Sequence, residues 1–299
     1  MQSLSFQSIS VDPVDLPILR GKDIRLEVLR LDKIHSDISG NTWFKLKYYL
    51  QRARDDHKNC ILTYGGAYSN HLLATAAAGK LLGFKTKGIV RGEAAIDLSP
   101  VLRQATDYGM ELFFITRSDY LQHKLPAGIG EKDKTLAINE GGYGIEGAMG
   151  ASEMLRFCEK ERYSHIACAV GSSTMMAGLI KAASPHQEIA GISVLRNNTG
   201  LNQDLHQLLT AEDRRKKFRI IHDYHFGGYA KHNKLLLNFM NELYASCQIP
   251  SDFVYTGKLF FAVSDMISNN YFPAGSNILV IHSGGLLGNS SLVKGQLIF

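Results

Sequence analysis

Residues 166–178 read IACAVGSSTMMAG. The first five residues are apolar and predict a short buried strand that ends at Gly171. The residues that follow the turn favour a helix, which we predict over residues 174–183. A strand that passes through a tight turn of small residues into a helix is the unit from which parallel sheets are built. This stretch therefore predicts an α/β fold.

The same alternation of strand and helix continues on both sides of this stretch. Short apolar runs predict strands, and helix-favouring segments of about 10–15 residues separate several of them. Such alternation predicts βαβ units and mainly parallel sheets flanked by helices. The predicted strands are residues 60–64, 85–90, 112–115, 136–138, 189–195, 218–221 and 278–281, and the other predicted helices are residues 70–82, 98–108, 145–162 and 234–245.

The composition is that of an ordinary soluble protein. The chain has 299 residues, of which 45% are hydrophobic and 20% charged, which is enough for one large or two modest domains. It has no apolar run of about 18 residues, so we expect no membrane partner. The net charge of +5 is mild, and the basic run at residues 214–217 lacks interleaved aromatic residues. We therefore expect no nucleic-acid partner either.

The four cysteines are not paired in CxxC spacing. Cys60 and Cys168 fall inside apolar strand-like runs, where a buried free thiol is the usual outcome. Unpaired buried thiols favour a reducing, cytoplasmic setting. The histidines are scattered and none has metal-ligand spacing beside a cysteine pair, so no metal site is predicted.

The turn after the predicted strand 166–170 is the best candidate for an anion site. Backbone N–H groups at a helix start attract anions, and small side chains let a phosphate approach the main chain. The residues at this turn are Gly171, Ser172, Ser173, Thr174 and Met175. They match neither the Walker A pattern nor GxGxxG. A plain turn of small residues with no ligand is the alternative.

A second glycine turn, GGAYSNH at residues 65–71, lies between a predicted strand and a predicted helix. Two glycines let the backbone turn sharply and come close to a ligand. Ser69 and Asn70 can also cap the helix that follows, which would be a purely structural role. From this motif alone, both interpretations stay open.

Residues 40–50, GNTWFKLKYYL, predict a glycine turn followed by a helix. Asn41 is expected at the N-cap, and Leu46, Tyr49 and Leu50 form one apolar stripe. On such a helix Lys45, three residues after Thr42, faces roughly the same side as Thr42.

Three further motifs are NEGG at residues 139–142, VYTGK at 254–258 and HSGG at 282–285. With the turns above, they make the chain resemble the pyridoxal-phosphate (PLP) family of 1-aminocyclopropane-1-carboxylate deaminase and D-cysteine desulfhydrase, from residue 40 to residue 285. The resemblance implies a fold type II, tryptophan synthase β-like architecture of two domains, each an open, mainly parallel, twisted sheet. It places a large PLP-binding domain in residues 1–44 plus 141–299 and a small inserted domain in residues 45–140.

The resemblance also implies the roles of individual residues. The family motif reads Gly-Asn-Lys, and the lysine forms the Schiff base with the cofactor, whereas this chain has Thr42. The other implied catalytic residues are Ser69 near the reacting carbon, Tyr229 over the site and Tyr255 near the substrate. The implied cofactor-binding residues are Asn41, Asn70 at the ring hydroxyl, Gly171, Ser172, Ser173, Thr174 and Met175 at the phosphate, Thr256 at the pyridine nitrogen and Ser283 beside the ring.

Thr42 leaves two functions open, because its hydroxyl cannot form an imine and is a poor base at neutral pH. The first is a lyase or hydrolase of a small amino acid, a deaminase or desulfhydrase. There the cofactor is held non-covalently, Lys45 replaces the missing lysine, or Thr42 is an engineered or variant residue. The second is a catalytically silent homologue that binds PLP or an amino acid as a sensor or scaffold. A neutral Thr256 favours the desulfhydrase-like members, and the family implies a homodimer.

Overall fold

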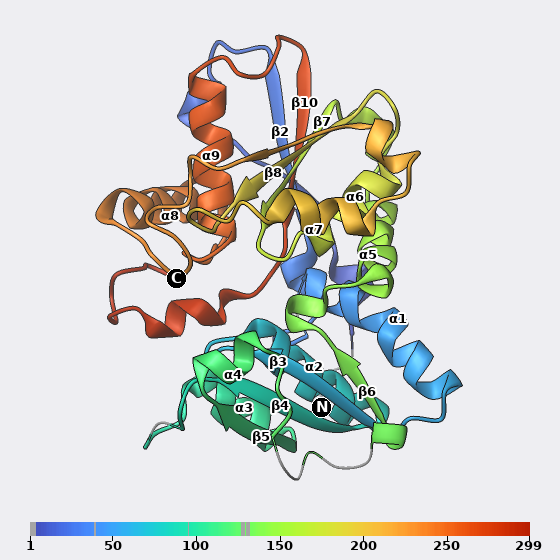
Figure 1. Cartoon of the computed structure of the whole chain (residues 1–299). Coiled ribbons are helices and arrows are strands. Elements are labelled where there is room, and N and C mark those ends of the chain that lie inside the picture. Colours follow the sequence, from blue (N-terminus) through green and yellow to red (C-terminus); the bar gives the residue numbers. More distant parts are fainter. Residues whose placement is uncertain (1–3, 39, 95, 127–128, 130–131) are drawn as a thin grey trace.

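The structure, a computed structural model, describes residues 4–38, 40–94, 96–126, 129 and 132–299. Its strands form two separate sheets with helices around them (Figure 1). Every neighbouring pair of strands is parallel except β1 and β2, which are antiparallel. The large sheet has the order β1 (Val11–Pro13), β2 (Ile24–Arg30), β10 (Ser276–His282), β7 (His165–Val170), β8 (Glu188–Ser193) and β9 (Lys217–Ile221). The small sheet has the order β5 (Met110–Ile115), β4 (Lys85–Arg91), β3 (Cys60–Gly65) and β6 (Thr135–Ile138).

Helices cover these sheets, so the prediction of parallel sheets flanked by helices is confirmed. The whole of β3 is buried, as expected for a parallel strand covered on both faces. Cys60 and Cys168 are buried free thiols, also as predicted. None of the helices in the described ranges has the length and apolar character needed to span a bilayer. The α-helices are α1 (Asn41–Asp55), α2 (Asn70–Leu82), α3 (Pro100–Asp107), α4 (Arg117–Leu121), α5 (Ile145–Ser152), α6 (Thr174–Ala182), α7 (Leu201–Leu208), α8 (Lys234–Cys247) and α9 (Thr256–Ser268).

Helix α1 belongs to the packing of both sheets. Phe44 packs in the core of the large sheet with Leu29 and Ile281. Leu46 and Leu50 pack instead in the core beneath the small sheet. The predicted boundary between residues 44 and 45 therefore lies inside a continuous helix. The strands of the small sheet do fall within residues 60–138, while the division into two domains stays a prediction.

The prediction of one helix over residues 145–162 is wrong. Helix α5 ends at Ser152, and the chain continues in two 3₁₀ turns, Glu153–Phe157 and Lys160–Arg162. The reason is tertiary, because Lys47 and Tyr48 of α1 both donate hydrogen bonds to the Glu153 carboxylate. These contacts fix the end of α5 against α1, which overrides the local helix preference of the segment.

The expected N-cap at Asn41 is also wrong, since Gly40 holds that position and Asn41 is the first helical residue. Gly40 has a φ of 62°, and a Cβ on it would lie 1.6 Å from the carbonyl oxygen of Ser283. The same carbonyl accepts the backbone N–H of Asn41 at 3.1 Å and its side-chain Nδ2 at 3.3 Å. This close approach ties the start of α1 to the end of β10.

We expect Gly40→Ala to lower the free energy of unfolding by about 3 kcal/mol or more, because a backbone conformation that is open mainly to glycine, with φ 62° and ψ −140°, and a main-chain overlap add together. Urea unfolding measures the change. Gly83→Ala is the matched control, since Gly83 has a φ of 80° but no atom within 4 Å of an added Cβ. The control should lose only about 1–2 kcal/mol. Equal losses in both variants would show that the contact with Ser283 contributes nothing.

Candidate cofactor and active site

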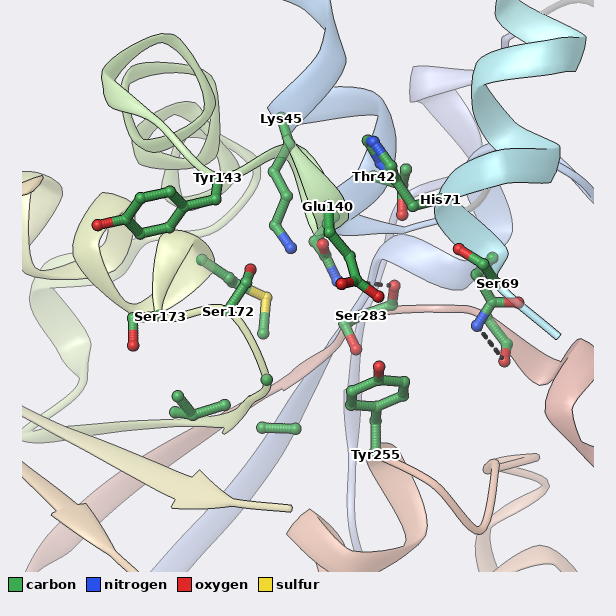
Figure 2. Close-up of a pocket in the computed structure, with 18 of the residues that line it drawn as sticks. Thr42, Lys45, Ser69, His71, Glu140, Tyr143, Ser172, Ser173, Tyr255 and Ser283 are labelled. Atoms are coloured by element: carbon green, nitrogen blue, oxygen red, sulfur yellow. Dashed lines mark hydrogen bonds between the residues drawn. The ribbon is translucent and has the colours of Figure 1, made fainter. Parts of the chain in front are cut away.

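A cavity of about 640 Å³ lies between the ends of strands from the two sheets, and Figure 2 shows residues that line it. Residues from the carboxyl ends of β3, β4, β7 and β10 line it, together with the first turns of α1, α2 and α6. Parallel strands gather their carboxyl ends at one edge of a sheet, which is where ligands of open α/β sheets bind. The volume suits a cofactor with a small substrate.

The structure brings nearly all of the predicted site residues to this cavity. The exceptions are Thr174 and Thr256, which do not line it. The predicted residues that do line it are Asn41, Thr42, Ser69, Asn70, Gly171, Ser172, Ser173, Met175, Tyr229, Tyr255 and Ser283.

The turn between β7 and α6 gives the cavity an anion-binding wall. The first turn of a helix leaves backbone N–H groups without partners in the helix, and the helix dipole favours negative charge there. The Ser173 hydroxyl donates to the carbonyl of Leu201 at 3.0 Å, and the Thr174 hydroxyl donates to the carbonyl of Ser172 at 3.2 Å. Both hydroxyls are thus engaged within the protein. The Ser172 side chain lines the cavity, and its hydroxyl oxygen lies within hydrogen-bond distance of the Thr174 hydroxyl, at 3.1 Å (Figure 2).

The 3₁₀ turn Glu140–Gly142 packs over this wall. Gly141 has a φ of 65°, and a Cβ on it would lie 3.1 Å from the Ser172 hydroxyl oxygen. Any side chain at Gly141 would therefore crowd the space in front of Ser172. The glycine keeps the anion-binding wall open.

Two asparagine oxygens in the cavity are buried without a partner among the described residues. Asn70 donates from Nδ2 to the carbonyl of Gly285 at 3.1 Å, which leaves its Oδ1 unpaired. Asn41 donates from Nδ2 to Ser283, and its Oδ1 is likewise unpaired. A buried acceptor without a partner is costly, so these atoms indicate a ligand that donates hydrogen bonds.

Ser69 caps α2, as the sequence suggests, and still lines the cavity. Its hydroxyl oxygen accepts the backbone N–H of Leu72 at 3.2 Å. A serine hydroxyl has one proton to donate in addition to its lone pairs. The capping bond therefore leaves that proton available to a ligand, so the capping role is confirmed and the ligand-binding role stays a prediction.

Two tyrosines form the wall opposite α1. The rings of Tyr229 and Tyr255 meet edge to face, with centroids 6.1 Å apart. Burial raises the pKa of Tyr229, and burial together with Tyr229 raises the pKa of Tyr255 well above its ordinary value. Both phenols therefore stay protonated at neutral pH and can donate hydrogen bonds.

Thr256 lies behind this wall, where it is hydrogen-bonded to Asp252. The Thr256 hydroxyl donates to the Asp252 carboxylate at 2.7 Å and accepts the backbone N–H of Asp252 at 2.8 Å. The same carboxylate accepts the backbone N–H groups of Val254, Tyr255 and Thr256. Asp252 thereby organises the start of α9 and fixes Tyr255. The structure shows no contact of Thr256 with the cavity.

A buried lysine fixes the other tyrosine. Lys258 donates from Nζ to the carbonyls of His225 at 2.9 Å and Gly228 at 2.7 Å. Burial lowers the pKa of Lys258 to about 8. The two bonds hold the loop that carries Tyr229 against α9.

Thr42 and Lys45 both line the cavity, as the helix spacing predicted. Thr42 is 9% exposed, and Lys45 extends its amine into the cavity (Figure 2). Lys47, on the same helix, instead bonds Glu153 outside the cavity.

His71 and Arg91 are among the lining residues that the sequence motifs did not predict. His71 follows Asn70 directly in the glycine-turn motif, and its ring reaches the cavity from α2. Arg91 ends β4, next to β3, and lies over the ring of Tyr120 at 5.5 Å. The position of Arg91 at the carboxyl end of a parallel strand was the available signal.

Comparisons with known proteins show which proteins this chain is similar to. No protein-family model matches the chain. A Thermotoga maritima protein, to which 1-aminocyclopropane-1-carboxylate deaminase activity is assigned provisionally, is 28% identical over 273 residues, 84% of this chain and 85% of its own. The bifunctional D-cysteine desulfhydrase/1-aminocyclopropane-1-carboxylate deaminase of Arabidopsis thaliana mitochondria is 26% identical over 88% of this chain and 73% of its own.

A solved structure of an ACC deaminase homologue superposes with a TM-score of 0.82 at 24% identity, over 97% of this chain and 92% of its own. A hydrogen sulfide-producing enzyme from Fusobacterium nucleatum superposes with a TM-score of 0.69 at 13% identity, over 95% of this chain and 96% of its own. These structures show the fold. The sequence matches identify the chain as a homologue of proteins named for 1-aminocyclopropane-1-carboxylate deaminase and D-cysteine desulfhydrase.

Proposed function

We propose that the chain binds pyridoxal 5'-phosphate in the cavity between its two sheets and acts on a small amino acid as a deaminase or desulfhydrase of the lyase type. One observation carries the proposal: an anion-binding helix start faces a buried, unpaired asparagine oxygen across a single cavity. The names of the relatives, D-cysteine desulfhydrase among them, support the substrate class.

The residues present fit this cofactor. Ser172 and the backbone at the start of α6 would hold the phosphate, and the space that Gly141 leaves open would receive it. The unpaired Oδ1 of Asn70 would accept a hydrogen bond from the ring hydroxyl. When bound, the cofactor supplies an electron sink for cleavage of bonds at the substrate's α-carbon.

The substrate would lie between the cofactor and the tyrosine wall. Ser69, Tyr229 and Tyr255 place their hydroxyl groups on the cavity wall, and hydroxyl donors suit a carboxylate. The raised pKa values of both tyrosines keep those protons in place at neutral pH. These groups would orient the amino acid.

Thr42 favours a second candidate function, a catalytically silent homologue that binds the cofactor or an amino acid as a sensor or scaffold. A threonine hydroxyl cannot form an imine with an aldehyde and is a poor base near neutral pH. The cofactor contacts proposed above are all non-covalent and do not involve Thr42, so they serve either function.

We extend the proposal to the cell and the assembly. The buried free thiols of Cys60 and Cys168 support a reducing, cytoplasmic setting. The family resemblance supports a homodimer.

Equilibrium dialysis against PLP, read by absorbance, tests the binding proposal. We expect saturable binding that inorganic phosphate weakens, because phosphate competes for the start of α6. Asn70→Ala should weaken binding about tenfold through the loss of one hydrogen bond. The absence of saturable binding would overturn the proposal. Assays of ammonia and sulfide release then separate the enzyme from the silent binder.

A further inference from the structure

We propose that Lys45 is the carbonyl-reactive amine of the cavity. It bonds covalently to the cofactor aldehyde in place of the family's lysine, whose position is occupied here by Thr42. The inference rests on the proposed function, because it needs the cofactor to be bound in the cavity with its phosphate at the start of α6. It deepens that function by assigning the covalent step to a different residue.

The first support is the isolation of the Lys45 amine. Among the described residues that line the cavity, Lys45 is the only lysine. Its Nζ makes no hydrogen bond or ion pair with a described residue. Other partly buried lysines of the chain are engaged. Lys47 pairs with Glu153, Lys181 pairs with Asp213, and Lys258 donates to two carbonyls. The amine of Lys45 is therefore free to react.

The second support is the neighbouring histidine, whose tautomer the hydrogen bonds determine. Thr63 donates its hydroxyl proton to the carbonyl of Ile138 at 2.9 Å, so it must accept from His71 Nε2, also 2.9 Å away. His71 is thus protonated on Nε2 and has a lone pair on Nδ1. That Nδ1 is buried and has no partner among the described residues.

Lys45 and His71 converge beside Gly142. A Cβ on Gly142 would lie 3.0 Å from Lys45 Cβ and 3.5 Å from His71 Cε1, the ring carbon next to Nδ1. Figure 2 shows the two side chains on the same side of the cavity. The imidazole of His71, with its free lone pair, therefore lies beside the aliphatic part of the Lys45 side chain and adds a neutral polar group near the amine.

The surroundings also favour the neutral, nucleophilic form of the amine. Burial lowers the pKa of Lys45 to about 8. Burial, with the charge of Lys45, lowers the pKa of His71 to about 3, so the histidine adds no positive charge at neutral pH. At pH 8 the Lys45 amine would be neutral in about half of the molecules. A lysine with the ordinary pKa would be neutral in less than about 1% of them.

The step balances without an oxidant or a reductant. The nitrogen lone pair of Lys45 adds to the aldehyde carbon and forms a carbon–nitrogen bond. The two amine protons then leave with the carbonyl oxygen as water, and a carbon–nitrogen double bond remains. Borohydride reduces that bond to a stable secondary amine, which marks the lysine that reacted.

Borohydride trapping after incubation with PLP, followed by digestion and peptide mass spectrometry, tests the assignment in the unmodified protein. We expect the reduced adduct mainly on Lys45, with a yield that rises with pH through a midpoint near 8, the lowered pKa of Lys45. Lys45→Met should lose the adduct, and Lys47→Met, the matched control on the same helix, should keep it. Circular dichroism checks that both variants fold.

Equilibrium dialysis of the same samples separates the two proposals. PLP binding with no adduct, or with adducts spread over exposed lysines, would overturn the role of Lys45 and leave the proposed function standing. Retention of the adduct in Lys45→Met would overturn it as well. No saturable PLP binding in any sample would defeat the proposed function itself.

Discussion

Thr42→Lys is expected to raise the turnover of a small amino acid by about 10²–10⁴-fold, the range that a positioned acid–base group contributes. Thr42 lines the cavity that also holds Ser172, Asn70 and Tyr255. A lysine there would add an amine one helix turn before Lys45, which can both bond the aldehyde and move a proton. Release of sulfide from D-cysteine, and of ammonia from it and from 1-aminocyclopropane-1-carboxylate, measures the gain.

Thr42→Met is the control for this gain, since it fills similar space without an amine. We expect Thr42→Met to stay at the activity of the unmodified protein. Borohydride trapping in Thr42→Lys should find the adduct shared between positions 42 and 45. If Thr42→Lys and Thr42→Met have the same turnover, Thr42 does not limit the reaction, and the silent-homologue function would require a further defect in the site.

Ser172→Asp is expected to weaken PLP binding by about a thousandfold. The substitution places a carboxylate where the phosphate would lie, and two like charges about 4 Å apart at an effective dielectric constant near 20 repel by about 4 kcal/mol. Equilibrium dialysis at constant ionic strength measures the loss. High salt should reduce the loss only in part, because this site is buried between two sheets.

Two further variants serve as controls for Ser172→Asp. Ser172→Ala removes the hydroxyl alone and should cost about tenfold or less. Ser118→Asp introduces the same charge in the first turn of α4, outside the cavity, and should leave binding unchanged. Unchanged binding in Ser172→Asp would mean that the phosphate does not lie at the start of α6.

Local patterns were sufficient for the elements that begin and end with strong signals. Helix α2 follows two glycines and Ser69 and ends at Gly83, and its predicted bounds match the structure. Helix α9 was not predicted. It carries Gly257 in its first turn, where a Cβ would lie 2.8 Å from Met240 Sδ, and its start is organised by Asp252 four residues earlier. The glycine weakens the helical pattern, and tertiary packing explains why it is there.

The candidate site was predictable where a motif sets the backbone and less so where another element competes for the side chain. Gly171 and Ser172 follow from the strand-to-helix turn. The direction of the Ser173 hydroxyl does not, because its acceptor, Leu201, lies 28 positions away in sequence. Thr256 is turned inward by Asp252 for a similar reason. A carbonyl or carboxylate supplied by the fold decided where these hydroxyls point.

Residues of α1 pack in the cores of both sheets. The two sheets therefore cannot move apart at this helix without exposing one of those cores. We therefore expect relative motion of the two sheets to be smallest near α1 and larger at residues farther from this helix, such as the Tyr229 loop that Lys258 holds against α9. Thr42 and the amine of Lys45 lie on α1 and would then move least. A substrate could enter and leave the cavity while the reacting groups keep their relative positions.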